Sequence, residues 1–109
     1  MKQYRIEISN GARSNLVSIY DHIAYMLASP ETAKKQYLRL EAGILSLKEM
    51  PERIKLVDFE PERSGGLRRL LVDHYSVFFV IENDIVVVTN VLYSASDVEQ
   101  RLKNKEHKP

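Results

Sequence analysis

The fold of this chain is decided by residues 67–93, LRRLLVDHYSVFFVIENDIVVVTNVLY. The alternation of side chains predicts three strands, over roughly 67–73, 75–82 and 85–93. Asn83-Asp84 is typical of a two-residue hairpin turn, because both residue types tolerate a positive φ. The segment 75–82 is apolar on both faces, which indicates a central strand. These residues therefore predict a three-stranded antiparallel meander.

Two helices are predicted before this meander, and one strand precedes them. Residues 3–9 alternate with a period of two, which indicates a half-buried strand. A first helix is expected over roughly 11–28, and a second runs from Ser29-Pro30 to Met50-Pro51. Both helices carry an apolar stripe at steps of three and four, which we expect to be buried in the core: Leu16, Ile19, Ile23, Leu40, Ile44 and Leu47.

The predicted order is β-α-α-β-β-β, with a short helix over Ala95–Leu102 capped by Ser94 or Ser96. It predicts an α+β fold in which a helical hairpin packs on one face of a mostly antiparallel sheet. The other face is expected to stay partly open for a partner or substrate. At 109 residues the chain is about one domain, residues 1–109, and its basic tail, 103–109, is expected to be flexible.

The amino-acid composition excludes several kinds of functional site. The chain has no cysteine, which excludes disulfides and cysteine-built zinc sites, and its three histidines lack ligand-like spacing. We therefore predict no metal and no cofactor. The net charge is only +1, weaker than is usual for a dedicated nucleic-acid-binding domain. No apolar run reaches the length of a membrane span and the first residues form no signal-peptide pattern, so we expect a cytoplasmic protein without membrane contact.

Three stretches, in this order, resemble the RelE/ParE superfamily of bacterial toxins. YRIEIS with the Ala-x-x-x-Leu helix is similar to the family's opening, SPETAKKQYLRLEAGILSLKEMPER to its second helix, and GLRRLLVDHYSVFFVIENDIVVVTNVLYSASD to its sheet. The resemblance covers about residues 3–102. It rests on hydrophobic spacing and a few polar positions rather than on one diagnostic motif.

The resemblance implies the toxin of a type II toxin–antitoxin system, as found in plasmid stabilisation, which a cognate antitoxin protein neutralises. It leaves the mode of growth inhibition open. One branch of the family consists of metal-independent endoribonucleases that cut mRNA on the ribosome, and the ParE branch inhibits DNA gyrase. A third alternative is a degenerate toxin that keeps only antitoxin binding. Whether the chain is an enzyme therefore also stays open.

Two positions depart from the ribonuclease pattern. Ser76 follows Tyr75 on the central strand, where a basic catalytic residue is common. Ser96 stands in the run from Tyr93 to Asp97, where arginine is common. Both departures remove positive charge, which favours the branch that does not cut RNA.

The resemblance and the chemistry of RNA cleavage together suggest four candidate catalytic residues. Cleavage by 2′-OH attack needs a base, an acid and cations that stabilise the charged phosphorane. Arg68 and Arg69 are adjacent on a strand, so only one of them can face an open site. His74 is either a group that titrates near neutral pH or a turn histidine. Tyr93 either donates a proton or packs under the last helix.

The long loop 51–66 offers a second set of candidates. Arg53, Lys55 and Arg63 are plausible nucleic-acid-binding cations that contact phosphates. The same loop contains four carboxylates that oppose them: Glu52, Asp58, Glu60 and Glu62. A phosphate-contacting loop and a solvated loop therefore both remain open.

Overall fold

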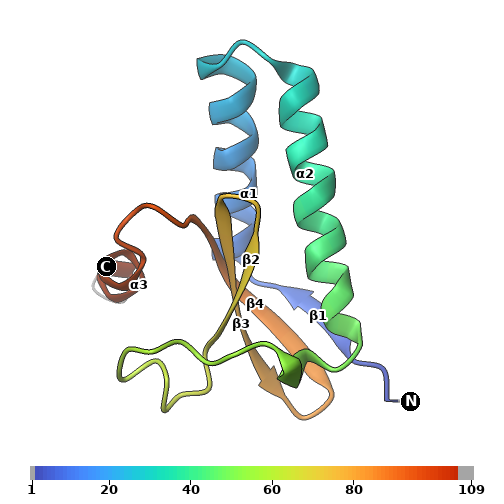
Figure 1. The fold of residues 1–109 in the computed structure, drawn as a ribbon, viewed down its shortest axis with the longest axis vertical. Helices are drawn as coiled ribbons and strands as arrows, with labels where there is room; N and C mark the ends of the chain where they lie inside the picture. Colours follow the sequence, from blue (N-terminus) through green and yellow to red (C-terminus); the bar gives the residue numbers. More distant parts are fainter. Residues whose placement is uncertain (1, 106–109) are drawn as a thin grey trace.

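The computed structural model describes residues 2–105 as a four-stranded sheet with helices on both of its faces (Figure 1). The elements are, in chain order, β1 (Arg5–Ile8), α1 (Asn10–Asp21), a π-helical turn (His22–Met26), α2 (Pro30–Leu45), two 3₁₀ turns (Ser46–Lys48 and Pro51–Arg53), β2 (Arg68–Val72), β3 (Tyr75–Glu82), β4 (Ile85–Tyr93) and α3 (Val98–Lys105). This order confirms the predicted α+β architecture. No described helix is both long and apolar enough to cross a membrane.

The sheet has the strand order β1-β4-β3-β2. β2, β3 and β4 form the predicted antiparallel meander, and β1 pairs in parallel with β4. The turn between β3 and β4 consists of Asn83 and Asp84, and Asn83 has a φ of 58°. β1 and β2 are therefore the two edge strands.

The helical hairpin of α1 and α2 packs on one face of the sheet and extends beyond it (Figure 1). Leu40, Ile44 and Leu47 are almost fully buried there against Val77 and Phe79 of β3. Where α2 crosses β2, a Cβ on Gly43 would lie 2.7 Å from the side chain of Val72. The absence of a side chain at Gly43 thus permits the close approach of helix and strand.

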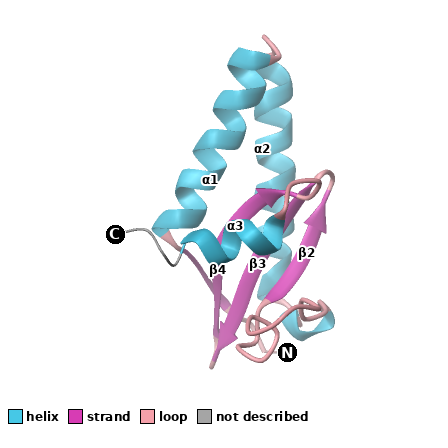
Figure 2. Cartoon of the chain, turned by 90° about the vertical axis from the view of Figure 1, so that its left-hand side faces the viewer, coloured by secondary structure: helices cyan, strands magenta, loops and turns pink. Residues whose placement is uncertain are grey.

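The opposite face is more covered than the sequence led us to expect. α3 lies across β3 and β4 on this face, with α2 behind the sheet (Figure 2). Residues of α3 and of the loop after α2 form a second apolar cluster with Phe78 and Leu92: Val57, Leu67, Val98 and Leu102. The loop thus folds back onto the sheet, because its own apolar residues are buried by doing so.

Several helix ends differ from the predicted ones. α1 ends at Asp21 and continues as the π-helical turn, where one uninterrupted helix to residue 28 was expected. α3 begins at Val98 rather than at Ala95, and the Oδ1 atom of Asp97, not Ser94 or Ser96, accepts the capping hydrogen bond from the Gln100 amide. α3 also includes residues 103–105 of the expected flexible tail; residues 106–109 lie outside the described part of the chain.

Candidate functional site

Arg69 lies on the sheet face opposite the helical hairpin. It is paired with Phe78 across the β2–β3 ladder, and its guanidinium lies over the Phe78 ring at 5.7 Å. Its Nε donates a 2.8 Å hydrogen bond to Oγ of Ser76, and this hydroxyl lies 2.7 Å from that of Ser94. Ser76 is fully buried. The Arg69 guanidinium is therefore held in one orientation by neutral groups.

Arg68 has a different environment from its neighbour, as strand alternation requires. Its Nη1 donates to the carbonyl oxygens of Ile54 at 2.6 Å and Glu52 at 3.2 Å. These bonds attach the loop after α2 to the edge strand β2, next to the bridge between Leu56 and Arg68. Of the two arginines, Arg69 is thus the one that faces away from the hairpin.

His74 and Tyr93 lie away from Arg69. His74 is exposed in the turn between β2 and β3. Tyr93 packs edge-to-face on Tyr75, with ring centroids 5.8 Å apart, on the hairpin side of the sheet. Both tyrosines line a cleft of about 690 Å³ between α1 and the end of β4. The four candidate catalytic residues are therefore distributed over both faces and a turn.

The structure does bring together the two arginines of β2 and the three loop cations. They line one groove of about 590 Å³, which we call the arginine groove: Arg53, Lys55, Arg63, Arg68 and Arg69. Glu52 and Asp58 are the carboxylates among its lining residues. Glu52 accepts a short hydrogen bond from the Tyr4 hydroxyl, which lowers the pKa of Glu52 and raises the pKa of Tyr4.

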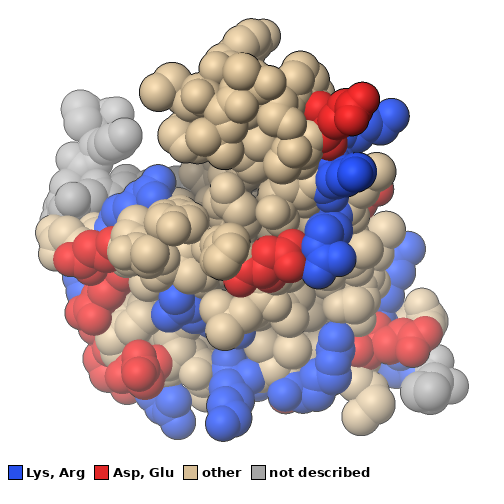
Figure 3. All heavy atoms as spheres, turned by 45° about the horizontal axis from the view of Figure 1, so that its top comes forward, with Lys and Arg blue, Asp and Glu red and all other residues tan. Residues whose placement is uncertain are grey.

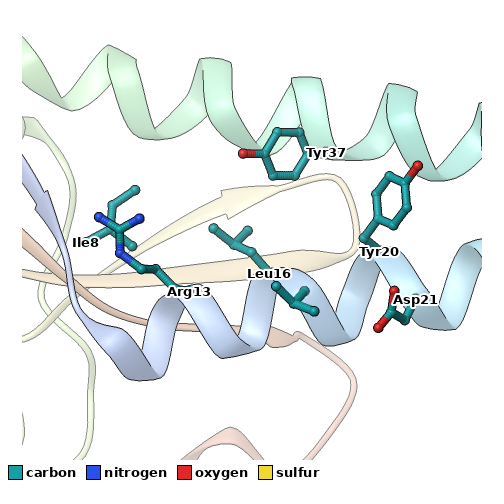
Figure 4. A pocket seen from close by; sticks show the side chains of 7 residues that line it. Ile8, Arg13, Leu16, Tyr20, Asp21 and Tyr37 are labelled. Atoms are coloured by element: carbon teal, nitrogen blue, oxygen red, sulfur yellow. The ribbon is translucent and has the colours of Figure 1, made fainter.

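A second groove lies between α1, α2 and the edge strand β1, and the sequence did not point to it (Figure 4). It has a volume of about 500 Å³, and its lining is mostly apolar: Ile8, Leu16, Val17, Tyr20 and Tyr37, with Arg13 and Asp21. A smaller hollow of about 220 Å³ adjoins it and shares three of these residues; it is also lined by Ile6, Glu41, Ile44 and Leu45. We call the two together the apolar groove.

The apolar groove exposes side chains of the kind that usually lie in a core. Val17 is 60% exposed and Leu45 is 47% exposed, while Leu16 at the floor is buried. Tyr37 precedes Leu40 of the predicted α2 stripe by three residues and so follows the same helical spacing, yet it is 39% exposed at the groove wall. A helical residue that lies between the core and solvent has the same sequence spacing as one inside the core. Sequence periodicity alone therefore does not reveal such a groove.

The chain matches a family model described as the ParE toxin of the type II toxin–antitoxin system parDE, over residues 6–98. This match includes both helices of the hairpin, β2, β3 and β4, and all of β1 except Arg5. The chain belongs to the ParE toxin family. It is therefore the toxin component of a type II toxin–antitoxin system.

Solved structures support the ParE-family fold. A chain of the chromosomal ParDE system from P. aeruginosa has a TM-score of 0.71 and 20% identity, covering 85% of this chain and 98% of that chain. A chain of a RelBE toxin–antitoxin complex from Mycobacterium tuberculosis has a TM-score of 0.57 and 18% identity, with coverages of 84% and 98%. An archaeal RelE–RelB complex from Pyrococcus horikoshii gives 0.50 and 16%, with coverages of 88% and 99%. No curated protein matches in sequence.

In this ParE-family chain, both serines that depart from the ribonuclease pattern accept a hydrogen bond from an arginine of another element. Ser76 accepts from Arg69 at 2.8 Å, and Ser96 accepts from Nη1 of Arg101 at 3.2 Å. Arg101 lies on α3 and lines the cleft beside Tyr93. Arg101 was not among the predicted site residues, because its proximity to Ser96 depends on where α3 begins. The two arginines do not share a groove.

Proposed function

We propose that this ParE-family toxin inhibits growth by binding DNA gyrase, and that it does not cleave ribosome-bound mRNA. The observation that carries this proposal is the separation of the candidate catalytic groups. RNA cleavage needs a proton acceptor, a proton donor and a cation at the same phosphate. Among the described residues, the guanidinium of Arg69 interacts with the Ser76 hydroxyl and the Phe78 ring, while His74 and Tyr93 lie away from it.

We further propose that a cognate antitoxin neutralises the toxin by placing the apolar side of an amphipathic helix in the apolar groove. The exposed apolar side chains of α1 and α2 support this, because burying them against a partner removes apolar surface from water. The structural relatives come from toxin–antitoxin systems, which supports an antitoxin protein as the partner. Gyrase and the antitoxin would then be separate partners of one small chain.

Two assays on the purified full-length chain test the mode of inhibition. We expect loss of supercoiling activity or accumulation of cleaved DNA with gyrase, and no cuts when primer extension is run on ribosome-bound mRNA. Robust cuts in ribosome-bound mRNA, with gyrase unaffected, would establish the endoribonuclease alternative.

One observation favours that alternative, namely that the arginine groove carries several cations beside the sheet. Arg69→Ala is the variant that addresses it. Removing one cation that stabilises a transition state typically lowers the rate by about 10²–10³. If the chain cuts mRNA, Arg69→Ala should abolish the cuts; a chain harmless in both assays would be a degenerate toxin that keeps only antitoxin binding.

A further inference from the structure

The cleft between α1 and the end of β4 has no part in the function proposed above. We call it the tyrosine cleft, because Tyr75 and Tyr93 line it. Its volume of about 690 Å³ is in the range of sites that hold small organic ligands. The residues that α1 contributes to it lie on the opposite side of the helix from those that line the apolar groove: Asn15, Ser18 and Ile19.

Most of the surface inside the tyrosine cleft is apolar or aromatic. Ile23 and Leu92 are buried among its lining residues, and the rings of Tyr75 and Tyr93 form the edge-to-face pair described above. The π-helical turn after α1 contributes Ile23 and also His22. Such turns are rare and frequently occur at functional sites. The cleft therefore suits a ligand with a flat apolar body, which can pack against these rings.

Two side chains bring oriented hydrogen-bond donors to the tyrosine cleft. Oδ1 of Asn15 accepts a 2.9 Å hydrogen bond from the Val91 amide, so the Nδ2 donors of Asn15 point elsewhere and have no partner among the described residues. Nη1 of Arg101 donates to Oγ of Ser96, which leaves other donors of the guanidinium available. Arg101 forms no ion pair with a described residue.

The distribution of charge around the tyrosine cleft favours an anion. Among the described residues that line it, none is Asp or Glu, and Arg101 is the one Lys or Arg. The apolar groove and the arginine groove, by contrast, each include carboxylates. Residues 22–30 carry no Asp, Glu, Lys or Arg, and the end of the helical hairpin is largely free of charged atoms in Figure 3. A negative group beside Arg101 therefore meets little repulsion.

We propose that the tyrosine cleft binds a small organic carboxylate with an aromatic body. The planar fork of donors on Arg101 matches the two oxygens of a carboxylate. Asn15 adds a neutral donor from the other side of the cleft, where α1 meets β4. The aromatic body packs against the tyrosine pair and Ile23. This ligand is a third partner of the chain, in addition to gyrase and the antitoxin.

A pair of probes that differ in charge tests the proposal. Phenylpropionate and its neutral amide, phenylpropionamide, have the same ring and nearly the same shape, so the difference between their affinities reports recognition of the charge. Both are titrated into the isotope-labelled full-length chain, and the shifts of its backbone amide signals in NMR spectra give the affinity and the place of binding.

The variants alter the donors of the tyrosine cleft one at a time. Arg101→Gln removes the positive charge, and Arg101→Lys keeps it. Asn15→Asp keeps an oxygen for the Val91 amide but adds a negative charge to the cleft. The matched control is Arg13→Gln, because Arg13 is an exposed arginine that lines the apolar groove and has no described side-chain partner.

Phenylpropionate should bind wild type with a Kd on the order of 1 mM, as is usual for a ligand of this size, and should shift the amides of Ile19 and Tyr93. The amide probe should bind about tenfold more weakly, because it lacks the hydrogen bond between charged groups. Arg101→Gln should weaken phenylpropionate binding by a similar factor, Arg101→Lys by less, and Asn15→Asp by at least as much as Arg101→Gln. Arg13→Gln should have no effect.

The amide probe should bind Arg101→Gln as well as it binds wild type. This comparison separates recognition of the carboxylate from a change in the shape of the cleft, which would weaken both probes. Arg101 is exposed, so its variants provide the test even if Asn15→Asp fails to fold, which circular dichroism would show.

Four results would overturn the proposal. They are no saturable binding of phenylpropionate up to about 10 mM, equal affinities of the two probes for wild type, equal effects of Arg101→Gln and Arg13→Gln, and shifts confined to residues of the apolar groove such as Val17. The proposal is independent of gyrase inhibition and of antitoxin binding, because the assay contains neither protein.

Discussion

The two grooves lie at opposite edges of the sheet and differ in chemistry. The apolar groove adjoins β1 and is walled by α1 and α2, whereas the arginine groove adjoins β2 and the loop after α2. One offers apolar surface that a partner helix can bury, and the other offers oriented positive charge. A chain of 109 residues can therefore present two unrelated surfaces, since β4 and β3 separate the two edge strands.

The difference also lies in how each groove is held in place. The floor of the apolar groove is the main core, so its shape depends on packing of Leu16 and Ile44. The arginine groove depends on hydrogen bonds from side chains to backbone oxygens of the loop. Substitutions should therefore affect the first groove through stability and the second through charge.

The largest effect is expected from Ile44→Ala. Ile44 is 3% exposed in the main core and also lines the apolar groove from below. Removing a buried side chain of this size typically costs about 2–5 kcal/mol of unfolding free energy. Chemical denaturation monitored by circular dichroism measures this cost. The neighbouring Leu45→Ala, at a position that is 47% exposed, should cost less than about 1 kcal/mol. Equal stability of Ile44→Ala and wild type would contradict the observed packing of α2.

The next effect concerns the antitoxin. Val17→Glu places a charge on the wall of the apolar groove, where a partner helix would bury it without a counter-ion. The affinity for the antitoxin should fall by about 30-fold or more, as at an interface hot spot. Leu38→Glu is the control, because Leu38 is exposed on α2 outside both grooves. Titration calorimetry would place the antitoxin elsewhere if both variants bound it equally well.

Local patterns in the sequence predicted most elements of the fold. The alternation in β3 and β4 and the Asn83–Asp84 turn depend on neighbouring residues only, and the structure confirms them. The covering of the second sheet face was not predicted. It requires Val57 and Leu67 to reach the sheet from a loop, and this contact joins residues distant in sequence.

The candidate sites were also predictable only where they depend on local sequence patterns. Strand alternation required Arg68 and Arg69 to differ, but only the hydrogen bonds of the folded chain decide which one faces the loop carbonyls. That Arg63 and Arg69 share a groove depends on how the loop folds back along β2. The apolar groove depends on the angle between two helices and a strand, which hydrophobic spacing does not encode.

A reciprocal pair of variants sharpens the comparison between the grooves. The sequence suggests phosphate contacts for the loop cations of the arginine groove. If the groove makes them, Arg69→Ala should weaken nucleic-acid binding but leave antitoxin affinity within about twofold, because effects at separate sites are usually independent to within about 0.5 kcal/mol. Val17→Glu should show the opposite pattern. Both affinities can be measured on the same two preparations. Loss of both activities in either variant would mean that the grooves form one surface or that the variant is unfolded, and a thermal melt separates these cases.

The smallest effect is expected at the ion pair that connects the hairpin to the β2–β3 turn. Nε of Arg39 on α2 lies 2.7 Å from Oδ2 of Asp73, and Gln36 donates to the same oxygen at 3.0 Å. The hydrogen bonds from Arg39 and then from Gln36 lower the pKa of Asp73 from 3.8 to about 2. A carboxyl group whose pKa is lower in the folded state stabilises the fold above its unfolded pKa, and this contribution disappears as the pH falls through the folded pKa.

Asp73→Asn should therefore melt slightly below wild type at neutral pH, and the gap should close between about pH 4 and pH 2. Arg39 is 66% exposed, so added salt should also narrow the gap. Thermal melts of both proteins over this pH range measure the gap; a gap that persists at about pH 2 would mean that Asp73 acts through the geometry of the turn, where its φ is 54°, rather than through its charge.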